Sequence, residues 1–121
     1  MKKRINQGVI ITIALLFSIA SGCKKESQKN SGTLNKLYDV YKNGDISECT
    51  YSGKIVYTAA LNVYDAATVV YDLEGKKIGD CNYAWNDVDP ICNQLNGCTV
   101  VYRCNNHISG EPFVDKYGLS K

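Results

Sequence analysis

Residues 46–60 read ISECTYSGKIVYTAA, and this stretch decides the fold because two β-rich runs flank a Ser-Gly pair. The dipeptide Ser52-Gly53 between residues 46–51 and 54–60 predicts a tight hairpin. The second run alternates in side-chain character from residue 55 to residue 58, which is typical of a strand with one buried face. The sequence therefore predicts that two antiparallel strands begin the sheet.

A second hairpin follows along the chain. Residues 67–71 read ATVVY, and Lys77-Ile78 lies beyond the tetrapeptide Asp72-Leu73-Glu74-Gly75. This spacing predicts a type I turn with Gly75 in the left-handed conformation, which forms a G1 bulge. A final strand is predicted over residues 99–103.

Two helical segments frame these strands. Apolar side chains at i, i+3, i+4 and i+7 predict a helix that packs on the sheet and ends at Gly44, with the face Leu34, Leu37, Tyr38 and Tyr41. A second short helix is predicted after Asp89, which would cap it, with Pro90 in its first position and Gly97 at its end. The fold class is therefore α+β: a small antiparallel sheet of about five strands with one or two short helices, supported by disulfides.

The N-terminal segment has the pattern of a targeting sequence. Lys2, Lys3 and Arg4 precede an uncharged apolar run over residues 8–20. This run is shorter than the roughly 20 residues that a membrane-spanning helix needs, and it fits the apolar region of a secretory signal. Small residues and a cysteine follow it, in the order Ala20-Ser21-Gly22-Cys23.

This tetrapeptide resembles the lipobox of bacterial lipoproteins, although that family usually has Leu where this chain has Ala20. The resemblance implies that signal peptidase II removes residues up to Gly22. Cys23 then carries a diacylglycerol and an N-acyl chain such as palmitate, with no other cofactor. Two or three acyl chains give stable anchoring to membrane lipid. The alternative is an ordinary secretory signal that is cleaved near Ala20 or Gly22.

The whole chain resembles small lipoproteins of the Bacteroidota. That resemblance implies a place in the cell envelope, anchored to the outer membrane. We expect residues 1–22 to be a signal peptide, residues 23–33 a lipidated flexible tether, and residues 34–121 a small α+β domain. Residues 24–33 contain no apolar side chain, which is typical of a disordered linker.

The charge distribution argues against nucleic-acid binding. Residues 24–44 hold five lysines and two acids, whereas residues 45–121 hold six basic and ten acidic side chains, a net charge of −4. A domain that binds nucleic acid normally has a basic face. No phosphate-binding glycine loop and no zinc-finger spacing is present in the sequence.

The cysteines indicate an oxidising compartment, because six are many for a chain of 121 residues. Without Cys23, the five that remain allow at most two disulfides. Cys98 and Cys104 lie on one strand about 20 Å apart and are excluded as a pair. Three pairings stay open: Cys92 with Cys98, and Cys49 with either Cys81 or Cys104. The unpaired cysteine is interpreted as an inert buried side chain, with a reactive thiol as the alternative.

No constellation in the sequence predicts catalysis. His107 is the sole histidine and is expected in a solvated loop, since a pair with Cys104 would require the chain to fold back. The serine-hydrolase motif GxSxG is absent. The oxygen-rich residues 80–89 lack the EF-hand order of ligands, so no metal site is predicted.

The aromatic residues are the feature that most suggests binding. Nine tyrosines and Trp85 stand beside two phenylalanines. Four of the tyrosines are expected to form cross-strand pairs in the sheet: Tyr51, Tyr57, Tyr71 and Tyr102. Tyr83 and Trp85 lie beside Asp87 and Asp89 and are the candidate contacts for a glycan or a peptide.

These observations favour a non-enzymatic interaction module with an unknown protein or glycan ligand. The alternative is an extracytoplasmic inhibitor of a protease or a lysozyme-like hydrolase. Asp89-Pro90-Ile91-Cys92 resembles the reactive-loop side of Kazal inhibitors, but the later cysteine spacing does not match that family.

Overall fold

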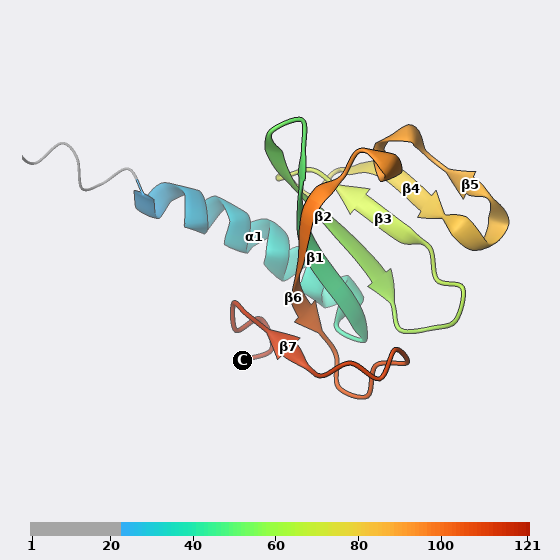
Figure 1. Cartoon of the computed structure of the whole chain (residues 1–121). Helices are drawn as coiled ribbons and strands as arrows, with labels where there is room; N and C mark the ends of the chain where they lie inside the picture. The colour runs from blue at the N-terminus through green and yellow to red at the C-terminus, as the bar shows by residue number, and fades with distance from the viewer. Residues whose placement is uncertain (1–22) are drawn as a thin grey trace, which may run out of the picture.

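The computed structural model describes residues 23–121, and the side chains of residues 31–121 (Figure 1). The predicted signal peptide and its cleavage after Gly22 lie outside the described residues. The elements are, in chain order, α1 (Cys23–Tyr41), β1 (Gly44–Tyr51), β2 (Lys54–Leu61), β3 (Thr68–Tyr71), β4 (Lys77–Asn82), the 3₁₀ turn η2 (Tyr83–Trp85), β5 (Asp87–Val88), the 3₁₀ turn η3 (Pro90–Asn93), β6 (Asn96–Arg103) and β7 (Val114–Asp115).

The predicted α+β class is confirmed, but the sheet has more strands than expected. The described residues form one sheet of seven antiparallel strands in the order β5-β4-β3-β2-β1-β6-β7, where about five strands were predicted. The additional strands β5 and β7 have two residues each and lie at the two edges. Such short pairings carry no alternating pattern that a sequence reading could detect.

Both predicted hairpins are confirmed. In the first, Tyr51 pairs with Lys54 across Ser52 and Gly53, whose φ values are 50° and 76°. Two consecutive left-handed residues define the type I′ turn, whose twist matches that of the strands. In the second, the amide of Gly75 donates to the carbonyl of Asp72 at 3.0 Å, and Gly75 has a φ of 87°.

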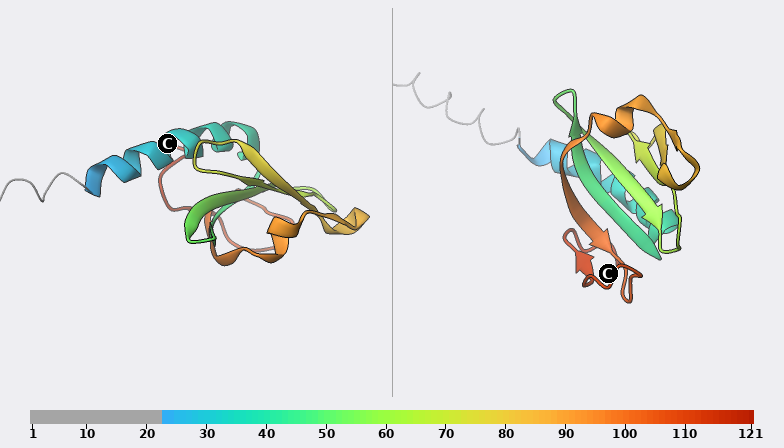
Figure 2. Two further views of the ribbon diagram at one scale, coloured as in Figure 1. Left: turned by 90° about the horizontal axis from the view of Figure 1, so that it is seen from above. Right: turned by 45° about the vertical axis from the view of Figure 1, so that its right-hand side comes forward.

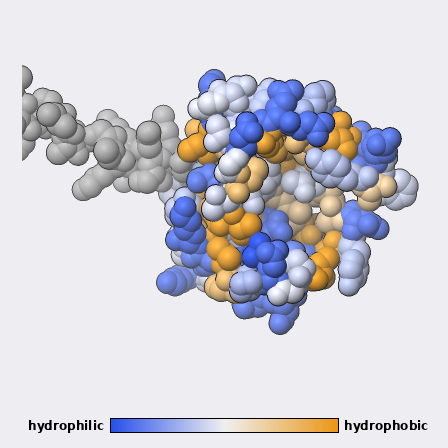
Figure 3. Space-filling model, viewed as in Figure 1, coloured by the Kyte–Doolittle hydropathy of each residue, from blue (hydrophilic) through white to orange (hydrophobic). Residues whose placement is uncertain are grey.

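The central strand β2 is buried on both faces, so the prediction of one buried face is wrong. Val56 is 3% exposed and its neighbour Tyr57 is fully buried, although consecutive side chains point to opposite faces of a sheet. Figure 2 shows α1 on one side of the sheet and the η3 segment on the other. The face that η3 partly covers is the one seen in Figure 3, where apolar side chains gather in patches between polar ones.

Helix α1 covers its face of the sheet with the side chains that the sequence predicted. Leu34, Leu37 and Tyr41 are each no more than 6% exposed. Residues 23–33, which we expected to be a flexible tether, form the first part of α1 in the structure. Its lysines, glutamate and glutamine favour helix and no proline interrupts it, so the helix extends beyond its buried face.

Gly44 is needed for close packing and not as the helix terminator that we predicted. The helix ends at Tyr41, and Gly44 is the first residue of β1. A Cβ atom on Gly44 would lie 2.0 Å from the carbonyl oxygen of Ala60, so only glycine lets β1 approach β2 this closely.

The short helix predicted near Asp89 is a 3₁₀ turn, η3, preceded by the strand β5. Pro90 takes the first helical position as predicted, but the Asp89 side chain does not cap the turn. The carboxylate instead accepts a hydrogen bond from the amide of Asp80 on β4, at 2.8 Å. Gly97 belongs to β6 and does not end a helix.

Of the four tyrosines expected as cross-strand pairs, two do not face another tyrosine: Tyr51 lies opposite Lys54, and Tyr102 lies opposite Ile46 and Asp115. Tyr57 lies opposite Tyr71 in the β2–β3 register, as a cross-strand pair. The hydroxyl of Tyr71 lies 2.6 Å from that of Tyr41 on the helix. Hydrogen bonding between the buried phenol of Tyr41 and the partly buried phenol of Tyr71 satisfies groups that would otherwise be costly to bury.

The described residues form two disulfides, Cys49–Cys98 and Cys81–Cys92, and Cys104 is free and buried. The count of two bridges and the exclusion of Cys98–Cys104 are confirmed, but all three pairings that were left open are wrong. Strand order explains the result, because β1 pairs with β6, which brings Cys49 beside Cys98, whereas Cys81 lies on β4, three strands away. Cys104 lies beside Gly44, at the other end of β1.

The cysteine arrangement predicts one free thiol that is hidden in the folded protein. Because Cys104 is only 7% exposed, we expect the Cys23→Ser chain to take up one alkyl group after denaturation and none before it. Intact mass measurement after alkylation without reduction checks this. The Cys23→Ser/Cys104→Ala variant should take up none, and fast alkylation of the native Cys23→Ser chain would contradict the prediction.

Candidate functional site

The first candidate site is a loop at the β5 edge of the sheet. Tyr83 and Trp85, the binding residues proposed from the sequence, stand on η2 between β4 and β5. Their exposed fractions are 65% and 78%. Large aromatic side chains are enriched where one protein surface meets another, so Tyr83 and Trp85 remain candidate contact residues.

Several interactions fix the backbone of this loop. The disulfide Cys81–Cys92 closes it at its base. The backbone amide of Asp89 donates to the carbonyl of Asp80 at 3.0 Å, next to the side-chain hydrogen bond described above. At the tip, the Asn82 side chain accepts from the amide of Trp85 at 3.2 Å. The aromatic side chains are therefore presented on a loop that is ordered before any ligand arrives.

The two acidic residues proposed with these aromatics have different positions. Asp87 is exposed on β5, beside the aromatic turn. Asp89 is partly buried and its carboxylate is engaged with β4, so it holds the loop and is not free to contact a ligand. Among the residues whose side chains are described, no group of three or more acidic, cysteine or histidine side chains could hold a metal ion.

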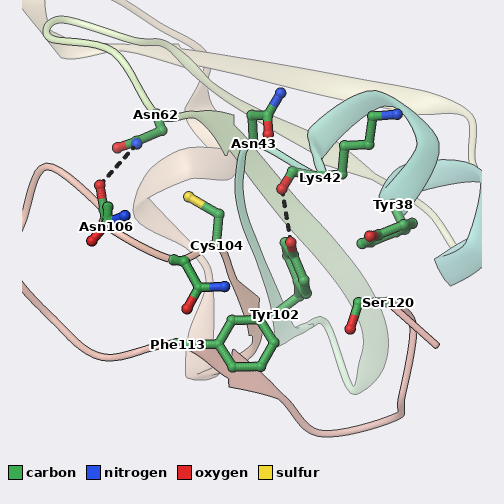
Figure 4. Close-up of a pocket in the computed structure, with 10 residues that line it drawn as sticks. Tyr38, Lys42, Asn43, Asn62, Tyr102, Cys104, Asn106, Phe113 and Ser120 are labelled. Carbon is green, nitrogen blue, oxygen red and sulfur yellow. Dashed lines mark hydrogen bonds between the residues drawn. The ribbon is translucent and has the colours of Figure 1, made fainter.

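The second candidate site is a pocket that the sequence did not reveal. A cavity of about 560 Å³ lies between the end of α1, the end of β6 and the C-terminal segment (Figure 4). Three aromatic rings contribute to it: Tyr38, Tyr102 and Phe113. They pack edge to face, with ring centroids 5.1 Å apart for Tyr38–Tyr102 and 6.1 Å apart for Tyr102–Phe113. This arrangement is favourable for aromatic pairs and holds the rings in place.

The rest of the pocket wall is polar, and most of it is amide. Four asparagines contribute: Asn43, Asn62, Asn105 and Asn106, together with Lys42, Cys104 and Ser120. In Figure 4, Asn62 and Asn106 lie on the opposite side of the pocket from Tyr38. The Asn62 side chain has a structural task, since it accepts from the amide of Ile108 at 2.8 Å and so fixes the loop after β6 to the end of β2.

The same loop contains a Ser-His-Asp chain of contacts. The Nε2 atom of His107 lies 3.0 Å from the carboxylate of Asp45, and its Nδ1 atom lies 2.8 Å from the hydroxyl of Ser109. His107 is therefore not the solvated loop histidine that we expected, since its side chain is only 11% exposed. Burial raises the pKa of the Asp45 carboxyl, and the neighbouring His107 opposes that shift.

The linked side chains of Ser109, His107 and Asp45 have the composition of a catalytic triad, but their surroundings do not support acyl transfer. An oxyanion needs free backbone N–H donors close to the nucleophile. The backbone amides of residues 108–111 all have acceptors. The amide of Ile108 donates to the side chain of Asn62, and that of Ser109 donates to Nδ1 of His107. The amide of Gly110 donates to the carbonyl of His107, and that of Glu111 donates to the hydroxyl of Ser109. The contacts therefore order the loop that forms one wall of the pocket.

Sequence reasoning found the aromatic loop but missed the pocket. Its wall combines residues from four segments that lie up to about 80 positions apart, and no motif connects them. The one available signal was composition, because Asn105-Asn106 lies one residue beyond the last predicted strand.

Comparison of the chain with protein-family models and with curated proteins gave no match, and a search of the solved structures gave none either. Among the described residues, no helix has both the length and the apolar character needed to cross a membrane. The geometry of the chain itself therefore provides the evidence about its function.

The pocket tyrosine Tyr102 predicts a loss of stability at high pH. Burial, and then the nearby Tyr38, raises the pKa of its phenol from 10.0 to about 12. Between these values the folded chain keeps a proton that the unfolded chain loses, so stability falls as the pH rises. A difference of one bound proton lowers the free energy of unfolding by at most about 1.4 kcal/mol per pH unit.

Urea unfolding measured from neutral pH to about pH 12 checks this prediction. The Tyr102→Phe variant should be less stable at neutral pH by about 1 kcal/mol, because it loses the hydrogen bond from the phenol to the carbonyl of Lys42. Its stability should also fall less steeply above pH 10. Equal slopes for the variant and the parent chain would contradict the prediction.

Proposed function

We propose that this protein is a lipid-anchored binding module of the bacterial cell envelope, held in the outer membrane by acyl chains on Cys23. The observation that carries the binding role is the pair Tyr83 and Trp85. Both side chains are mostly exposed, and they stand on a loop that the Cys81–Cys92 disulfide closes.

An ordered loop favours binding for an entropic reason. A flexible loop must be ordered when a ligand binds, and that cost reduces the affinity. Here the disulfide and the hydrogen bonds of Asp80 and Asn82 fix the backbone in the free protein. The flat faces of an indole and a phenol suit the apolar face of a sugar ring or a peptide side chain. Asp87 adds an exposed carboxylate at the edge of this surface.

The position of α1 supports an anchored orientation of this surface. The helix begins at Cys23, and its first turns extend away from the sheet (Figure 1). In Figure 1, and in the view from above in Figure 2, the β4–β5 region lies on the opposite side of the molecule from that helix end. A lipid on Cys23 would therefore leave the aromatic loop directed away from the bilayer.

Inhibition of an envelope hydrolase is the second candidate function, and the same loop favours it. A protruding segment closed by a disulfide is suited to blocking an active-site cleft, because it resists deformation in that cleft. The Cys81–Cys92 bridge provides this closure next to Asp89-Pro90-Ile91. The two candidate functions share this loop, and a measurement of hydrolase activity beside a measurement of binding distinguishes them.

Cys23→Ser should abolish acylation of the protein. We expect labelled palmitate on the parent chain and none on the variant, because serine lacks the sulfur that is acylated. Metabolic labelling with palmitate, followed by isolation of each chain, measures this. A variant that still takes up label would exclude Cys23 as the acylated residue.

Tyr83→Ala/Trp85→Ala should abolish binding to an envelope ligand. The Cys23→Ser chain is incubated separately with isolated cell-wall sacculi and with an envelope protein extract, and bound chain is quantified. Loss of two exposed anchor side chains should weaken binding at least tenfold, since such residues dominate interface energies. The matched control is Tyr117→Ala, an exposed tyrosine near the opposite edge of the sheet, which should bind like the parent chain.

Two results decide between the candidate functions. If the parent chain also lowers the rate of a secreted protease or a lysozyme-like hydrolase, and the double variant does not, the inhibitor function is supported. If the double variant retains all of the binding that the parent chain shows, the aromatic loop is not the ligand surface and this part of the proposal is excluded.

A further inference from the structure

The pocket of Figure 4 has unused hydrogen-bonding capacity beside fixed aromatic rings. Within residues 31–121, the side-chain amides of Asn43, Asn105 and Asn106 have no hydrogen-bond partner. Each amide offers two donors and an acceptor, and all three side chains are exposed to solvent at the pocket wall. These groups do not stabilise the fold, so they are available to a ligand.

The chemistry of the wall selects the class of ligand. No carboxylate lines the cavity, which argues against a metal ion or an organic cation. Hydroxyl groups both donate and accept hydrogen bonds, and amides match them in both respects. The Phe113 ring, which is 44% exposed, offers apolar surface for the C–H face of a sugar ring, and the buried Tyr102 ring packs edge to face against it. A cavity of about 560 Å³ lies in the range of small-molecule sites.

We propose that this pocket binds a saccharide unit, with the free amides of Asn43, Asn105 and Asn106 contacting its hydroxyl groups and the exposed Phe113 ring contacting its apolar face. Lys42, the one permanently charged side chain at the wall, pairs with a carboxylate when the sugar carries one. The site lies near β6 and the β7 edge of the sheet, whereas the aromatic loop lies at the β5 edge. The two sites are therefore separate, and this inference does not rest on the proposed function of the loop.

Titration of the full chain with three sugars tests the proposal. The protein is purified with its anchor in a detergent that has no sugar head group, since a glycosidic detergent would compete. The probes are glucose, N-acetylglucosamine and glucuronic acid, and the readouts are NMR shifts of the backbone and side-chain amides together with calorimetry. We expect at least one probe to shift the signals of Asn43, Asn105 and Asn106. Absence of such shifts with all three probes would overturn the proposal.

The variant Asn43→Ala/Asn105→Ala separates a binding role from a structural one. Because neither amide has a protein partner, the variant should fold with an unchanged melting temperature, and its affinity for the bound probe should fall about tenfold. Asn35→Ala, an exposed asparagine on α1 outside the pocket, is the matched control and should bind like the parent chain. A double variant that binds with parental affinity would exclude these amides as the ligand contacts.

Two further variants test the role of Lys42 and the independence of the pocket from the aromatic loop. Lys42→Ala should weaken the binding of glucuronic acid and leave that of glucose unchanged. Tyr83→Ala/Trp85→Ala should leave the shifts of the pocket asparagines unchanged, because those residues belong to the other site. If the loop variant abolishes these shifts, the sugar binds at the loop and the pocket proposal is wrong.

Discussion

The central strands β1 and β2 bury side chains on both faces of the sheet, and the other segments are arranged to cover those faces. Tyr57 and Val56 show this constraint, because they are sequence neighbours and both are buried. A domain of about 90 residues buries a smaller fraction of its surface than a larger domain does, so few residues are available to cover two hydrophobic faces. Helix α1 covers one face, and the short η3 segment covers part of the other.

The covering of the second face explains the use of disulfides. A turn of four residues such as η3 buries little more than Ile91 and would be held weakly by packing alone. Cys81–Cys92 joins it to β4, and Cys49–Cys98 joins β1 to β6. The first of these bridges also closes the loop that carries Tyr83 and Trp85. One covalent constraint therefore supports the second hydrophobic layer and orders the candidate binding surface.

The pocket results from a different feature, the way the chain returns after β6. Asn62 at the end of β2 and Asp45 on β1 hold the loop that contains His107, and β7 then pairs with β6. These contacts bring the C-terminal segment beside the end of α1. The wall that forms between them contains asparagine amides that the fold itself does not use, which is the basis for proposing a ligand there.

Local patterns in the sequence determined the class of fold, both hairpins with their turns, the apolar face of α1, the number of bridges and the exposed aromatic pair. These features depend on residues that are close in the chain, such as Ser52-Gly53 or Asp72 and Gly75, so propensity and spacing are sufficient to predict them. The cysteine partners, the role of Asp89, the burial of His107 and the pocket were decided by tertiary structure alone. Each depends on which strands become neighbours, and strand order is set by the burial of two faces over the whole chain, which no local pattern records.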